Sequence, residues 1–120
     1  MLLNNFFEIK ETINNATEDG QTVAVTLLRA HPVYEGHFPG NPVVPGVCLI
    51  QMIKEIVEIK NGRSYFLGKT DNVKFLNVIN PDINPDLSID LTYKQTDHFQ
   101  IKATISFKEK VFLKFSGTFS

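Results

Sequence analysis

Apolar and polar residues alternate along the last part of the chain, between residues 99 and 119. A period of two is typical of antiparallel strands that bury one face. The pattern predicts strands at residues 99–108 and 111–119, joined by a turn at residues 109–110. The apolar positions of the two strands are Ile101, Ala103, Ile105 and Phe107, then Val111, Leu113 and Phe115.

Earlier runs of β-branched and apolar residues predict further strands, separated by clusters of Asn, Asp, Gly and Pro that are typical of turns. Residues 6–12 form a short segment of mixed character, and no strand is predicted there. The expected strands are residues 22–30, 64–69, 73–79 and 87–95, and the expected turns are residues 14–20, 80–86 and 96–98.

A helix is expected over residues 45–60. Pro45 suits the first helical turn, where its missing N–H would have no partner, and Asn61-Gly62 is a stop signal. Apolar side chains cover most of the helix, so we expect it to be buried on most sides, with a sheet wrapped around it. A narrower polar stripe, with Glu55 expected to be solvated, consists of Gln51, Lys54, Glu55 and Glu58.

Residues 31–46, between the first long strand and the helix, hold four of the six prolines of the chain and three glycines. Proline removes backbone donors and glycine costs conformational entropy, so no regular structure is expected there. The apolar side chains in this loop favour an ordered conformation, and a long ordered loop in a small domain is usually functional. Taken together, the elements predict an α+β fold in which an antiparallel sheet wraps around one long central helix.

The composition fits one globular domain, residues 1–120, with 42% hydrophobic residues. A net charge of −1 argues against a protein that binds nucleic acid by neutralising phosphates. The single cysteine, Cys48, rules out an internal disulfide and fits a reducing compartment. No apolar run approaches the roughly 20 residues that span a bilayer, and the first residues do not look like a signal peptide. These observations predict a cytoplasmic protein.

The segment G-H-F-P-G-N-P-V-V-P-G-V, residues 36–47, is the most specific motif of the chain. It resembles the active-site signature of the 3-hydroxyacyl-[acyl carrier protein] dehydratases of type II fatty acid synthesis. The resemblance extends more weakly to Lys74-Phe75 and the proline-containing turn that follows. It implies a hotdog fold and a lyase that acts on acyl thioesters in fatty acid, lipid or polyene-type biosynthesis. The preceding His31-Pro32 is similar to short dehydratase-like proteins of aryl-polyene-type pathways.

The resemblance also implies roles for individual residues. Dehydration of a 3-hydroxyacyl thioester needs a base for the α-proton, and His37 matches the family's catalytic histidine. The thioester oxygen needs a fixed donor, which the Gly46 N–H would supply at the start of the helix. The substrate-binding residues expected around them are Tyr34, Phe38, Pro39, Gly40, Pro45 and Val47.

Gln51 departs from the family pattern, because the family has Glu or Asp fourteen positions after the histidine. Loss of a general acid typically costs about 10²–10⁴ in rate. Gln51 could hold a water molecule or the substrate hydroxyl group by hydrogen bonding, or Glu55, one turn further along, could replace the acid. The chain could instead bind acyl chains or a carrier protein without turnover, act as a hotdog thioesterase, or receive the acid from a partner subunit.

The expected partners are an acyl carrier protein or a coenzyme A thioester, and a second copy of the chain. In the resembling family the site forms between two subunits, so His37 of one chain would face Gln51 of the other. His31 is expected to be structural, His98 exposed and Cys48 a packing residue, and no cofactor or metal is implied. A docking surface for an acidic carrier protein would be basic, and the candidates are Lys94, Lys102, Lys108, Lys110 and Lys114.

Overall fold

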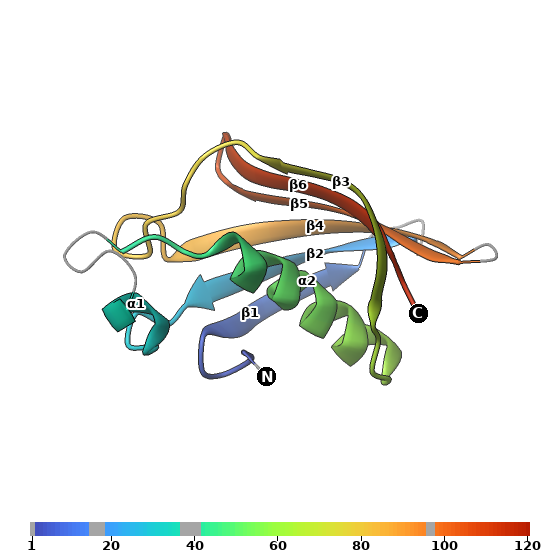
Figure 1. Ribbon diagram of the computed structural model, residues 1–120, viewed down its shortest axis with the longest axis horizontal. Coiled ribbons are helices and arrows are strands. Elements are labelled where there is room, and N and C mark those ends of the chain that lie inside the picture. The colour runs from blue at the N-terminus through green and yellow to red at the C-terminus, as the bar shows by residue number, and fades with distance from the viewer. Residues whose placement is uncertain (1, 15–18, 37–41, 96–97) are drawn as a thin grey trace.

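The computed structural model describes residues 2–14, 19–36, 42–95 and 98–120. A six-stranded antiparallel sheet carries one long helix, α2, along one of its faces (Figure 1). The order of strands across the sheet is β1-β2-β4-β5-β6-β3. The elements are β1 (Phe7–Asn14), β2 (Gly20–Leu27), α1 (Val33–Gly36), α2 (Gly46–Asn61), β3 (Leu67–Phe75), β4 (Asp86–Gln95), β5 (Phe99–Phe107) and β6 (Lys110–Phe119).

The strands predicted at residues 87–95, 99–108 and 111–119 are confirmed with small shifts at their ends. Strands β4, β5 and β6 pair as an antiparallel meander, and their apolar positions face the core. The mixed segment at residues 6–12 lies mostly in a strand, β1, which pairs with β2. The two strands expected at residues 64–69 and 73–79 are instead one strand, β3, whose register with β6 shifts at Leu67/Lys69 and at Thr70/Asn72.

Helix α2 begins and ends close to the predicted residues, 45 and 60. Pro45 is its N-cap residue, and Gly62 ends it in the left-handed conformation with φ 64°. The prediction that the helix is buried on most sides is wrong at Val47, which is 77% exposed, and at Ile59. The helix therefore has an open face away from the sheet. Its core-facing residues are Leu49, Met52, Ile53, Ile56 and Val57.

The loop before α2 contains one helical turn, α1, so the expectation of no regular structure is wrong there. The Nδ1 atom of His31 accepts a hydrogen bond from the backbone N–H of Val33 at 3.1 Å and so caps this turn. The His31 ring also packs edge-on against Phe6. His31 thus has the structural role expected of it. Residues 37–41 of the motif lie outside the described residues.

The C-cap glycine gives the first prediction. No atom lies within 4 Å of the position that a Cβ of residue 62 would take, so the cost of Gly62→Ala comes from its positive φ alone. We expect Gly62→Ala to lower the free energy of unfolding by about 1 kcal/mol. Gly62→Asn should cost less, because Asn tolerates this conformation better. Urea denaturation of both variants checks this, and equal losses would contradict it.

Candidate functional site

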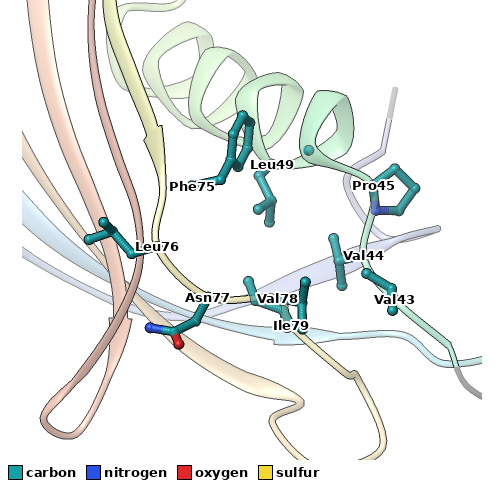
Figure 2. Close-up of a pocket in the computed structure, with 10 residues that line it drawn as sticks. Val43, Val44, Pro45, Leu49, Phe75, Leu76, Asn77, Val78 and Ile79 are labelled. Carbon is teal, nitrogen blue, oxygen red and sulfur yellow. The ribbon is translucent and has the colours of Figure 1, made fainter.

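An apolar groove lies beside the first turn of α2, between the segment that enters the helix and the segment that leaves β3 (Figure 2). Its volume is about 440 Å³. We call it the N-terminal groove. It is lined by Val43, Val44, Pro45, Gly46, Leu49, Phe75, Leu76, Asn77, Val78 and Ile79.

Backbone hydrogen bonds hold the walls of the N-terminal groove in place. The N–H of Val44 donates to the carbonyl of Ile79 at 2.9 Å and so joins the two walls. The N–H of Leu76 donates to the carbonyl of Phe112 at 2.9 Å, which ties the second wall to β6. The side chain of Asn77 points away from Leu49, and its Nδ2 donates to the carbonyl of Val111 at 2.8 Å (Figure 2). This hydrogen bond satisfies the amide of Asn77 on the side away from Leu49, so this wall of the groove stays apolar.

The polar end of the groove is the start of α2. The first N–H groups of a helix have no acceptor within it, and Pro45 makes no side-chain cap hydrogen bond. A Cβ at Gly46 would stand 2.7 Å from the ring of Phe75, so only a residue without a side chain lets the ring lie this close. An apolar groove that ends at helix N–H groups suits a ligand with an apolar chain and a carbonyl oxygen at its end.

Gln51 lies on a different side of the helix from Gly46. Five residues at 100° each place the two positions about 140° apart around the helix axis. Gln51 lines a second groove, between the later turns of α2 and the segment that leads into β3. We call this the C-terminal groove; other residues that line it are Lys54, Glu58, Ile59, Tyr65 and Phe66. Within one chain, therefore, the predicted donor Gly46 and the predicted Gln51 do not face the same groove.

Comparison with known proteins identifies the family. A profile described as "ApeI-like: ApeI dehydratase" matches residues 13–114. The chain belongs to the ApeI-like dehydratase family. A 3-hydroxyacyl-[acyl-carrier-protein] dehydratase FabZ from Levilactobacillus brevis is 32% identical over 85 residues, which cover 65% of this chain and 57% of that protein. A FabZ from Caulobacter vibrioides is 29% identical over 89 residues, covering 67% and 56%.

The ApeI-like chain thus spans a little over half the length of the curated relatives it matches. Among solved structures, the dehydratase heterocomplex ApeI:P from Xenorhabdus doucetiae aligns with a TM-score of 0.75 at 15% identity, over 93% of this chain and 96% of that one. A hypothetical thioesterase from Streptococcus pneumoniae, solved with coenzyme A, aligns with a TM-score of 0.64 at 13% identity, over 94% and 83%. These matches confirm the hotdog fold and the resemblance to the dehydratases.

In the ApeI-like chain, some of the predicted site residues that the structure describes line the N-terminal groove and others do not. Pro45 and Gly46 line the N-terminal groove. Val47 points out from the first turn of α2 and is highly exposed. Tyr34 is buried in the core, where its ring stacks on Phe6 and lies under the guanidinium of Arg29, and it does not line the groove. The remaining predicted residues, His37, Phe38, Pro39 and Gly40, lie outside the described residues.

Glu55 corrects an expectation, because it is fully buried rather than solvated. Its carboxylate accepts hydrogen bonds from the backbone N–H groups of Leu2 and Leu3 at 2.9 Å. It also accepts one from Nε2 of Gln51 at 3.0 Å. The start of the chain thereby closes over this part of α2. Sequence spacing alone gave Glu55 and Gln51 the same polar stripe but could not show what covers it.

The groove wall formed by Leu76, Val78 and Ile79 was not predicted. The strand expected at residues 73–79 ends at Phe75, and the next residues leave the sheet. One feature of the sequence could have indicated this wall. The apolar residues after Lys74 do not alternate with polar residues, as they would in a half-buried strand. Phe75 is 57% exposed and Val78 72% exposed, which is unusual for large apolar side chains that line the same groove.

The other titratable candidates do not build a site. His98 is exposed, as expected. Within the described ranges no group of three or more His, Cys, Asp or Glu side chains could hold a metal ion. None of the helices among the described residues is long and apolar enough to cross a membrane.

Cys48, in the first turn of α2, gives a prediction about pH. Burial raises the pKa of its thiol above the ordinary value of 9.0, so its thiolate is scarce at neutral pH despite the nearby helix N-terminus. We expect slow alkylation by iodoacetamide whose rate climbs about tenfold per pH unit between about pH 7 and pH 9. The same protein unfolded in urea is the control and should react faster. A rate that levels off below about pH 8 would contradict the raised pKa.

Proposed function

We propose that this ApeI-like chain is a dehydratase that converts a 3-hydroxyacyl thioester, carried on the phosphopantetheine arm of an acyl carrier protein, into the enoyl thioester. The observation that carries the proposal is the N-terminal groove, in which apolar walls lead to Gly46 at the start of α2, whose N–H has no partner among the described residues. The walls would hold the acyl chain, and the Gly46 N–H would bind the thioester oxygen as it gains negative charge. The family relationship supports the same reaction class.

The reaction can be written with a single titrating group. His37, placed by the family motif, takes the proton from the α-carbon, and the electron pair is delocalised onto the thioester oxygen at Gly46. The bond from the β-carbon to the hydroxyl oxygen then breaks, and the imidazolium of His37 returns its proton to the departing oxygen. Water and the enoyl thioester are the products. Gln51 holds the hydroxyl group by a hydrogen bond, because an amide does not titrate as a carboxylic acid does.

The site is shared between two copies of the chain, with Gly46 and His37 from one and Gln51 from the other. Support comes from the different directions in which Gly46 and Gln51 face on a single helix. Strand β3 forms an edge of the sheet and pairs with β6 alone, so its outer side is a template for a second copy. The exposed apolar side chains at this side of the molecule would be covered by that copy; they are Val47, Phe75, Leu76 and Val78.

The carrier protein would dock on basic residues near the groove. Lys108 is in the turn between β5 and β6, and Lys110 begins β6 next to Val111, whose carbonyl accepts a hydrogen bond from Asn77 of the groove. Lys102 and Lys114 lie exposed on neighbouring strands further along the sheet, and Lys94 is in β4. Lys108 and Lys110 are therefore the first choice for contact with an acidic carrier. The proposed location is the cytoplasm, where the free thiol of Cys48 would stay reduced.

A second candidate function is acyl-thioester binding without turnover. Gln51 favours it, because it stands where the family has an acid. The solved ApeI structure is a heterocomplex, so an equivalent partner of this chain could supply the missing group. The thioesterase alternative is supported by likeness to a protein solved with coenzyme A, and this likeness concerns the fold alone. The match of residues 36–47, which include Gly46, to the dehydratase motif favours the dehydratase over both alternatives.

The test is turnover of a 3-hydroxyacyl-carrier thioester by the purified chain, followed by formation of the enoyl product. We expect turnover that falls about 10²-fold or more in His37→Ala, since the base would be lost. Gln51→Glu should keep or raise the rate by restoring a titrating group. The coenzyme A thioester of the same acyl group is the control for carrier contacts. No turnover by the wild type, with activity in Gln51→Glu, would move the conclusion to binding.

A further inference from the structure

Glu55 is a buried carboxylate that the proposed reaction does not use. Its exposed fraction is 0%. Oε1 accepts hydrogen bonds from the N–H groups of Leu2 and Leu3, and Oε2 accepts from Leu2 and from Nε2 of Gln51, all between 2.9 and 3.0 Å. Every one of these neighbours is a donor, so Glu55 serves only as an acceptor.

The contact with Glu55 decides how the amide of Gln51 is turned. An amide group carries its donor nitrogen and its acceptor oxygen on opposite sides of one planar group. A carboxylate surrounded by donors requires the nitrogen of Gln51 on its side, which leaves Oε1 on the other. Across the described residues, no donor reaches Oε1 of Gln51. The described residues thus leave this oxygen open to a further donor.

We propose that Glu55 is a positioning residue, which fixes Gln51 with its amide oxygen presented as an acceptor to the 3-hydroxyl group of the substrate. This inference rests on the proposed dehydratase function. A hydroxyl group that donates its hydrogen to Oε1 keeps its lone pairs free, and one of them can accept the proton that His37 returns. A Gln51 turned the other way would donate to that oxygen and occupy one of its two lone pairs, in competition with the proton from His37.

The orientation of the Gln51 amide can be measured without following dehydration of a substrate. In ¹⁵N-labelled protein the side-chain NH₂ of Gln51 should show slow hydrogen exchange, at least about tenfold slower than the side-chain NH₂ of exposed Gln100, because one hydrogen is bonded to a buried carboxylate. Loss of the signals in Gln51→Leu assigns them. Glu55→Gln should remove the protection, since an amide at position 55 can accept or donate and no longer fixes the orientation of Gln51.

Steady-state kinetics distinguish two roles for Glu55, which are positioning Gln51 and anchoring the backbone of Leu2 and Leu3. We expect Glu55→Gln to lower kcat about tenfold or more with a smaller change in KM, because the hydroxyl group is misplaced while the acyl groove is intact. Leu2→Pro is the matched control, since it removes the Leu2 N–H donor to Glu55 but leaves the contact with Gln51. It should keep the protected amide and the wild-type kcat, even where it lowers the unfolding midpoint.

The outcomes are distinct. A fast-exchanging Gln51 amide in the wild-type protein overturns the inference, whether or not the chain has activity. A protected amide with an unchanged kcat in Glu55→Gln overturns it as well. An equal kcat loss in Leu2→Pro would assign Glu55 an anchoring role and also overturn it. If the wild type shows no turnover, the proposed function fails, and the orientation of Gln51 is then decided by the amide exchange alone.

Discussion

The packing of α2 along one face of the antiparallel sheet is the constraint on which the rest of the structure depends. Burial of Leu49, Met52, Ile53, Ile56 and Val57 fixes the rotation of the helix about its own axis. That rotation turns Gly46 toward the N-terminal groove and Gln51 toward the C-terminal groove. One helix thereby presents Gly46 at one groove and the amide of Gln51 at the other, with the two residues about 140° apart around the helix axis.

The architecture of the chain was largely predictable from its sequence. Alternation in β5 and β6, the helix start at Pro45 and its stop at Gly62 are local signals, and each acts within a few residues. The irregularities of β3 were not predictable, because they arise from its pairing with β6, more than 40 residues away. The turn α1 was missed because proline and glycine in its neighbourhood outweighed the local capping by His31.

The lining of the N-terminal groove was predictable where the family motif covers it, as at Pro45 and Gly46. It was not predictable where distant segments meet. The buried state of Glu55 depends on the backbone of Leu2 and Leu3, more than 50 residues earlier, which no pattern on the helix reveals. The groove wall at Leu76, Val78 and Ile79 likewise depends on the strand ending at Phe75 rather than continuing. Both features change the surroundings of Gln51 and Gly46.

Complementation between two variants tests the shared site most directly. His37→Ala and Gln51→Ala are each expected to be impaired, and unfolding and refolding them together forms mixed dimers that contain one intact site. With random pairing, the mixture should regain about a quarter of the wild-type activity. A mixture no more active than its separate components, under conditions in which the wild type refolds to full activity, would contradict a site built from two copies of this chain.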